Sequence, residues 1–156
     1  MPLSLEGPRC MCGANGCWEA YISNLATISR YFGKNLSPRQ PLSLEAANFT
    51  IEDLVRRARV GDGKALAALH LTARYLGLGL ASIINAIDPS QIYLGGEITE
   101  AWDLIESQVR NAMKERTLTA ELGTTPIRIV PASDYPRLRG AVALVTAPAF
   151  AAPKVA

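Results

Sequence analysis

Three cysteines near the start of the chain are the residues whose type and spacing predict chemistry most directly. Cys10, Cys12 and Cys17 lie within the string CMCGANGCWE, and they are all the cysteines of the sequence. A disulfide framework uses an even number of cysteines spread along a chain, so this cluster favours a metal site. Gly13 and Gly16 permit the sharp turn that brings three thiolates to one zinc ion, at about 2.3 Å from each sulfur.

Other interpretations of the cluster are weaker. An interpretation as thiols without metal is disfavoured because two glycines interleave the cysteines. An interpretation as a redox pair is disfavoured because no CxxC spacing occurs. Structural zinc takes four ligands, and three are evident. His70, the one histidine of the chain, lies in an apolar helical pattern, where a satisfied core residue is commoner than a ligand. We expect Cys17 to open a helix whose dipole favours its thiolate form.

The first half of the chain is predicted to be helical around this loop. Residues 1–16 are punctuated by glycine and proline, which is typical of a loop, and a helix is predicted from Cys17 to about Gly33. Residues 34–49 look irregular. Thr50 and Asp53 form a capping-box pattern ahead of a short helix. A longer helix over 64–87 is apolar on most of its surface, so it should be central and buried, and Gly77 and Gly79 predict close approach of a neighbouring backbone.

The second half of the chain has the order strand, helix, strand. Such a crossover unit places two strands parallel in an α/β sheet, which two strands alone cannot stabilise. Either residues 1–50 add strands or something outside this chain completes the sheet. The predicted elements are a strand over 91–94 followed by Gly95 and Gly96, a helix over 100–116, a strand over 126–130 and a last helix from about Pro136.

Composition argues for a folded protein and excludes few partners. Hydrophobic residues make up 49% of the chain and the formal net charge is +2. That charge is too small to indicate nucleic-acid or membrane binding. The most apolar segment, 75–87, is interrupted by glycine and polar residues, and no secretion signal is visible. We therefore expect a cytoplasmic protein with no membrane contact and no direct nucleic-acid contact.

Three stretches resemble one family. GPRCMCGANGCWEAY resembles the zinc signature of the ROK family (repressors, open reading frames and kinases). YLGLGLASIINAIDPSQIYLGGEI resembles its second characteristic block, and RGAVALVTAPAF its C-terminal helix. The resemblance implies a two-domain actin-like (ribonuclease H-like) ATPase fold that binds a sugar and ATP with Mg²⁺ in its cleft. Kinases of the family phosphorylate hexoses, and its repressors add a helix-turn-helix and use the sugar as effector.

The resemblance also assigns individual residues. Cys10, Cys12 and Cys17 match the family's cysteine ligands to zinc. Glu19 matches a glutamate that hydrogen-bonds sugar hydroxyls, a task that suits a carboxylate because it accepts from two neighbouring hydroxyls. Without the resemblance, Glu19 would be interpreted as an ordinary carboxylate at a helix start. Gly95 and Gly96 match the diglycine that approaches the nucleotide.

Parts of the family pattern are not found in this sequence. The glutamate–histidine segment that supplies the fourth zinc ligand would precede Met1, and the phosphate loop and the aspartate that acts as general base belong to the N-terminal domain. None of the aspartates at positions 53, 62, 103 and 134 sits in a matching motif. We therefore expect a truncated C-terminal lobe forming a single domain. Its parts would be a zinc loop over 1–17, an α/β body over 18–135, and a helix over 136–156 that normally returns to the missing lobe.

These features predict a fragment of a ROK protein that binds a hexose and is similar to ATP-dependent sugar kinases, without catalysing phosphoryl transfer alone. Whether the chain belongs to an enzyme stays open, and no catalytic residue is assigned. The alternative is the effector-binding domain of a sugar-responsive repressor, and a third possibility is a structural partner of full-length relatives. Exposed apolar surface on the central and last helices predicts a homo-oligomer.

Overall fold

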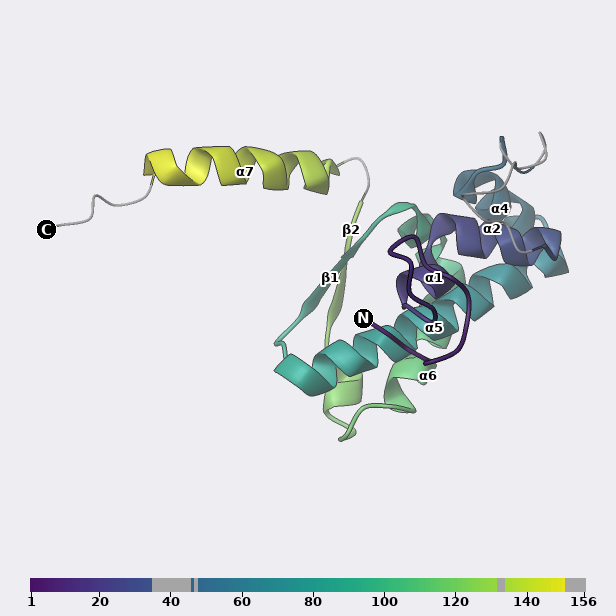
Figure 1. Ribbon diagram of the computed structural model, residues 1–156, viewed down its shortest axis with the longest axis horizontal. Coiled ribbons are helices and arrows are strands. Elements are labelled where there is room, and N and C mark those ends of the chain that lie inside the picture. The colour runs from purple at the N-terminus through teal and green to yellow at the C-terminus, as the bar shows by residue number, and fades with distance from the viewer. Residues whose placement is uncertain (35–45, 47, 132–133, 151–156) are drawn as a thin grey trace, which may run out of the picture.

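The computed structural model describes residues 1–34, 46, 48–131 and 134–150 (Figure 1). Most of the segment 34–49, predicted to be irregular, lies outside the described residues. Among these described residues the structure places six helices, two short 3₁₀ turns and two strands. In chain order they are α1 (Glu19–Ile22), α2 (Asn24–Phe32), α4 (Ile51–Arg59), α5 (Gly63–Ile87), β1 (Ile92–Gly95), η1 (Glu97–Ala101), α6 (Trp102–Lys114), η2 (Leu122–Thr124), β2 (Ile127–Val130) and α7 (Pro136–Phe150).

Helix α5 is the centre of the fold, as the apolar pattern predicts. The Asp62 side chain accepts hydrogen bonds from the backbone N–H groups of Lys64 and Ala65, which begins the helix, and Asp88 in the left-handed conformation ends it. Helices α1, α2, α4 and α6 all pack against it. By length and composition α5 could cross a membrane, but 56% of its most apolar window is buried within the structure. A core helix has the same signature.

Gly77 allows α6 to pack closely on α5. A Cβ atom at Gly77 would lie 2.3 Å from the carbonyl oxygen of Val109 and 2.7 Å from the Cβ of Ala112. Only a residue without a side chain fits there, so the predicted approach of a neighbouring backbone is confirmed at this position. The contact buries Ile105, Val109 and Met113 of α6 completely.

The helix predicted over 17–33 is wrong in its continuity and its start. Ser23 is extended, with φ −61° and ψ 156°, and divides the segment into α1 and α2. Its hydroxyl accepts a hydrogen bond from the Ala26 N–H, so Ser23 is the N-cap of α2. Cys17 lies outside both helices and forms an isolated antiparallel bridge with Pro2. The loop is thereby tied to the start of α1.

The capping box at the start of α4 is confirmed. The Thr50 hydroxyl accepts from the Asp53 N–H, and the Asp53 carboxylate accepts from the Thr50 N–H. Hydrogen bonds also join α2, α4 and the start of α5. Tyr31 donates to Asp62 over 3.0 Å, and Arg57 donates to the Tyr31 hydroxyl over 2.9 Å.

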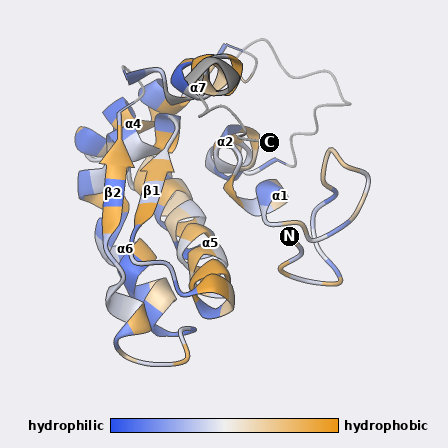
Figure 2. Cartoon of the chain, turned by 90° about the vertical axis from the view of Figure 1, so that its left-hand side faces the viewer, coloured by the Kyte–Doolittle hydropathy of each residue, from blue (hydrophilic) through white to orange (hydrophobic). Residues whose placement is uncertain are grey.

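The two strands are parallel, as predicted, and pair Ile92 with Ile127 and Gly95 with Val130. One sheet face packs on the helical core through Ile92, Leu94 and Ile127, as Figure 2 illustrates by the position of the strands beside α5 and α6. Tyr93 is 65% exposed on the other face. Residues 1–34 add no strand, so the described part of the sheet has two strands only. The helix predicted from residue 100 begins as the 3₁₀ turn η1 and becomes α6 at Trp102.

Helix α7 projects from the body beyond the end of β2 (Figure 1). It begins at Pro136, where the sequence predicts it. Its apolar side chains are largely exposed, at 62% for Leu138, 78% for Leu144 and 79% for Val145. The described residues therefore form an α/β body with one helix that adds little to its core. The division into a zinc loop, a body and a returning helix stays a prediction.

Candidate metal site and adjoining cleft

The three cysteine sulfurs converge at one point of the N-terminal loop. The Sγ atoms of Cys10, Cys12 and Cys17 all lie within 4.8 Å of one another, and those of Cys12 and Cys17 are 3.6 Å apart. Two thiolates on a tetrahedral zinc ion, each about 2.3 Å from the metal, stand about 3.8 Å apart. The three thiols are free of disulfides, and their arrangement fits a metal ion with small adjustments.

The loop backbone holds this arrangement through its glycines. Cys10 donates its N–H to the Ala14 carbonyl over 2.8 Å, and Gly13 returns an N–H to the Cys10 carbonyl over 3.0 Å. Gly16 has φ +67°, and a Cβ there would lie 2.0 Å from the Ser4 carbonyl oxygen. The chain therefore folds back on itself as the interleaved glycines predict.

The pKa of Cys17 is shifted in the opposite direction to the one predicted from the sequence. Hydrogen bonds lower the pKa of Cys12, chiefly one from the Ala14 backbone and then one from the Cys17 side chain. The same thiol–thiol hydrogen bond, together with burial, raises the pKa of Cys17 to about 11. The expectation of a helix-favoured thiolate at Cys17 is therefore wrong, because Cys17 lies before a helix of only four residues and its sulfur shares a hydrogen-bonded proton with the Cys12 sulfur. A metal ion must displace that proton to bind both sulfurs.

His70 takes no part in this cluster. It lies in α5, half-buried, with its Nε2 3.2 Å from the carbonyl oxygen of Leu104. The interpretation of His70 as a satisfied residue is confirmed, at a half-buried position rather than in the buried core. Among the described residues, no other histidine, cysteine or acidic group joins the three cysteines as a candidate ligand.

Trp18 fastens the cysteine loop to α5. Its indole Nε1 donates a hydrogen bond of 2.9 Å to the Tyr75 carbonyl. The ring lies where Gly79 has no side chain, since a Cβ there would approach the indole to 2.0 Å. The predicted close approach at Gly79 is thus made by a side chain rather than by a backbone. Trp18 stands between Cys17 and Glu19 in the sequence, so this contact positions both.

Glu19 lies on the wall of a cleft of about 1000 Å³ beside the cysteine loop. Its side chain is exposed at the first position of α1. One wall of the cleft is the loop over 7–11, another is one face of α2, and Leu71 and Tyr75 of α5 complete it. Cys10 lines the same cleft, so the structure brings Glu19 and the cysteine cluster together. The volume lies within the range of small-molecule sites.

Arg30 is a polar group of this cleft that carries no motif in the sequence. Its guanidinium donates hydrogen bonds of 2.6 Å to the Thr72 hydroxyl and to the Tyr21 carbonyl. It also lies 5.3 Å from the centroid of the Tyr75 ring. Burial lowers the pKa of Arg30 from its ordinary value, and the nearby Tyr75 acts in the opposite direction. An arginine remains charged under such a shift.

Gly95 and Gly96 lie apart from the residues that line the cleft. Gly95 ends β1 and Gly96 follows it, at the carboxyl edge where ligands bind in open α/β sheets, and both are exposed. Gly96 has φ +112°, and its carbonyl accepts from both the N–H and the hydroxyl of Thr99. A hydrogen bond between Asn24 and Glu97 joins the start of α2 to this turn. The diglycine is thus linked to the Glu19 region without sharing its cleft.

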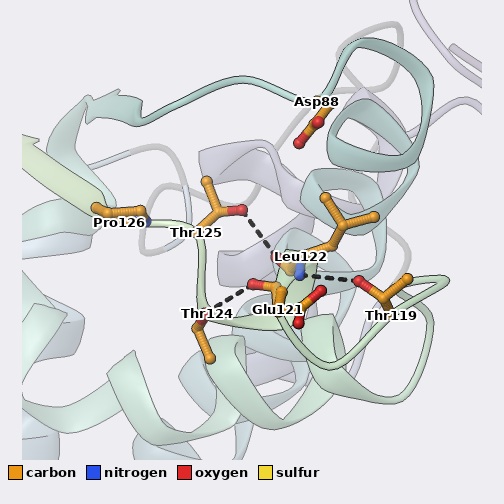
Figure 3. A pocket seen from close by; sticks show the side chains of 7 residues that line it. All are labelled: Asp88, Thr119, Glu121, Leu122, Thr124, Thr125 and Pro126. Carbon is orange, nitrogen blue, oxygen red and sulfur yellow. Dashed lines mark hydrogen bonds between the residues drawn. The ribbon is translucent and has the colours of Figure 1, made fainter.

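A second pocket of about 440 Å³ lies at the other end of the sheet (Figure 3). Its hydroxyl groups are engaged locally, because Thr124 donates to the Glu121 carbonyl and Thr125 to the Leu122 carbonyl. The acidic residues among the described lining are Asp88 and Glu121. None of the predicted site residues lies there, so the cleft beside Glu19 is the stronger candidate.

Comparison with known proteins defines the class of this fold. The ROK family model matches residues 1–147. A solved ROK family transcriptional regulator, a homologue of the E. coli MLC protein, superposes with a TM-score of 0.66 at 27% identity, covering 84% of this chain and 33% of that chain. The described α/β body therefore has the actin-like fold of ROK sugar kinases and regulators, and the chain belongs to the ROK family.

The curated relatives include both regulators and kinases. The chain is 30% identical over 142 residues to the transcriptional dual regulator NagC of Escherichia coli K12. This match covers 89% of this chain and 34% of NagC. The chain is 32% identical over 117 residues to a glucokinase of Streptomyces coelicolor, covering 70% of this chain and 37% of the glucokinase. The chain thus spans about a third of the length of these relatives.

The contact between Trp18 and Gly79 predicts a specific substitution effect. Gly79→Ala should displace the indole and destabilise the protein by about 1–3 kcal/mol, because the added methyl group overpacks the contact. Gly63→Ala is the matched control, since no atom lies within 4 Å of a Cβ there. Thermal unfolding and Trp18 fluorescence in a Trp102→Phe background measure both effects. Equal behaviour of the two alanine variants would contradict the assigned contact.

Proposed function

We propose that this chain is the sugar-binding part of a ROK protein, with the sugar in the cleft beside Glu19. The observation that carries the proposal is the position of Glu19 on the wall of a cleft that Cys10 also lines, one residue after the Trp18 anchor. A carboxylate held there can accept hydrogen bonds from adjacent sugar hydroxyls. The names of the relatives support a sugar ligand, since they include a xylose repressor, an N-acetylglucosamine repressor and glucokinases.

Zinc at Cys10, Cys12 and Cys17 belongs to this proposal as a structural element. The three sulfurs lie near the spacing that zinc requires, and the loop that carries them forms one wall of the cleft. A bound ion would replace the thiol–thiol hydrogen bond between Cys12 and Cys17 with two metal bonds. It would thereby hold the loop against α1 and keep Glu19 in place.

The zinc proposal predicts one metal ion per chain after purification under reducing conditions. Cobalt substitution should give the intense absorption of thiolate-to-metal charge transfer, and Cys12→Ser should weaken binding because a hydroxyl is a poorer ligand. Elemental analysis and absorption spectroscopy measure these outcomes. All the cysteines of the sequence belong to the cluster, so thiol titration reads the site alone. Reduced, titratable thiols with no bound metal would contradict the proposal.

The 156-residue polypeptide is proposed to bind sugar without transferring phosphate. Phosphoryl transfer needs positioned phosphates and an oriented nucleophile. Among the described residues, no aspartate lines the Glu19 cleft. Asp53 and Asp62 cap helices, and Asp103 pairs with Arg59. Gly95 and Gly96 are proposed as part of a nucleotide wall in the intact protein, where ATP and Mg²⁺ would bind.

A sugar-responsive repressor is the second candidate for the intact protein. The match to NagC covers more of this chain than the match to the glucokinase, which favours a regulator. In that case the same cleft would bind the sugar as an effector, and no direct DNA contact from this chain is proposed. A cytoplasmic location suits both candidates. We also propose that the exposed apolar side chains of α7 promote self-association.

Glu19 is the residue that tests sugar binding. Glu19→Gln should weaken sugar binding at least tenfold, since a hydrogen bond to a charged group contributes about 1.5–3 kcal/mol. Glu121→Gln in the second pocket is the matched control and should leave binding unchanged. Calorimetry with glucose, xylose and N-acetylglucosamine measures both variants. Failure of all three sugars to bind, or an equal loss in Glu121→Gln, would refute the proposal.

A further inference from the structure

We infer that the cleft beside Glu19 takes a sugar that carries an anionic group, with Arg30 as the residue that binds the anion. The inference rests on the proposed sugar site and specifies its ligand further. A phosphate ester and a carboxylate offer the same chemistry to a guanidinium, namely two negatively charged oxygens in one plane.

Arg30 is half-buried beside the cleft without a carboxylate partner among the described residues. Four other arginines in the described part of the chain form ion pairs with carboxylates. These pairs are Arg56–Asp53, Arg59–Asp103, Arg74–Glu115 and Arg110–Glu106. Arg30 instead has a neutral hydroxyl and a carbonyl as its hydrogen-bond acceptors. A partly buried cation is costly without a counter-charge. An anionic ligand in the cleft would supply that charge.

The guanidinium is held in one orientation by three neighbours. Thr72 and Tyr21 accept its two hydrogen bonds, and the Tyr75 ring lies beneath it. Tyr75 in turn stacks on Tyr21 with their centroids 4.4 Å apart. These hydrogen bonds use two of the five N–H groups of an arginine. Three N–H groups remain to donate to an anionic ligand, and little side-chain entropy is lost when it binds because the guanidinium is already held.

Charge around the cleft agrees with this assignment. Lys34 lies four residues after Arg30, two residues beyond the end of α2, and Arg9 lies on the loop wall. Glu19 is the one carboxylate among the described residues that line the cleft. A sugar would therefore place its hydroxyl groups toward Glu19 and its anionic group toward Arg30. The volume of about 1000 Å³ accommodates a phosphorylated hexose.

A purely structural role for Arg30 makes a different prediction. A brace between α2, α5 and α1 would affect stability and the binding of every sugar equally. An anion-binding residue affects the preference for charged over neutral sugars. The preference ratio therefore separates the two roles, whatever the variants do to stability.

The experiment measures binding of glucose, glucose 6-phosphate, glucuronate and inorganic phosphate to the full chain by calorimetry. Arg30→Met removes the charge at similar length, and Arg30→Lys keeps the charge without the fork. Arg110→Met, which breaks an ion pair on α6, is the matched control. Circular dichroism and thermal unfolding establish that each variant is folded at the temperature of the titration.

The inference predicts that at least one charged sugar binds ten times more tightly than glucose, with the preference weakened by added salt. Arg30→Met should reduce the ratio to within twofold of one, Arg30→Lys should keep part of it, and Arg110→Met should leave it unchanged. Equal binding of glucose and both charged sugars would overturn the inference while leaving the sugar site intact. Inorganic phosphate binding as tightly as glucose 6-phosphate would also overturn it. Absence of binding by every sugar would refute the sugar site itself.

Discussion

The contact between the Trp18 indole and Gly79 is the interaction on which the candidate site depends. The indole occupies the space that a side chain at position 79 would fill, and it donates a hydrogen bond to the Tyr75 carbonyl. Cys17 precedes Trp18 and Glu19 follows it, so one contact fixes a proposed metal ligand and the proposed sugar-binding residue to the central helix. Because α5 is also the packing partner of α6 through Gly77, the site is built on the central helix of the fold.

The cleft combines elements that are far apart in the sequence. The cysteine loop and α1 supply Cys10 and Glu19, α2 supplies Arg30, and α5 supplies the Tyr75 ring under the guanidinium. The diglycine at the end of β1 lies outside the cleft and is connected to it through the Asn24–Glu97 hydrogen bond. The proposed sugar wall and the proposed nucleotide wall, which are adjacent but separate, suit both a kinase and a regulator. The described residues alone favour neither.

Much of this architecture follows from local patterns in the sequence. The capping box at Thr50, the buried character of α5 and the parallel strands are each set by short-range chemistry or by simple periodicity. The cysteine cluster was predictable because its three cysteines lie within one loop. Glu19 was assigned through the family signature rather than through its own chemistry, since an exposed carboxylate at a helix start has no distinctive pattern.

Other features depend on tertiary contacts that no local pattern reports. Ser23 interrupts the predicted helix because its hydroxyl caps α2, which the apolar periodicity on both sides conceals. The raised pKa of Cys17 depends on the position of the Cys12 sulfur. Arg30 lies in a helix with ordinary spacing, and its role emerges only when Thr72, Tyr75 and Tyr21 surround it. The sequence offered two signals for these features. One was Ser23 in the middle of the predicted helix, and the other was the single basic residue Arg30 in the same segment.

The central claim is that the cysteine loop, α1 and α2 enclose one ligand site. Backbone amide chemical shifts of the zinc-loaded, isotope-labelled chain, recorded during titration with glucose and glucose 6-phosphate, test it most directly. The claim predicts shift changes confined to residues 7–11, 19–23 and 29–34 and to the α5 segment around Tyr75, with none at the pocket lined by Asp88 and Glu121. Changes centred on that second pocket, or changes absent from the amides around Glu19 and Arg30, would contradict it.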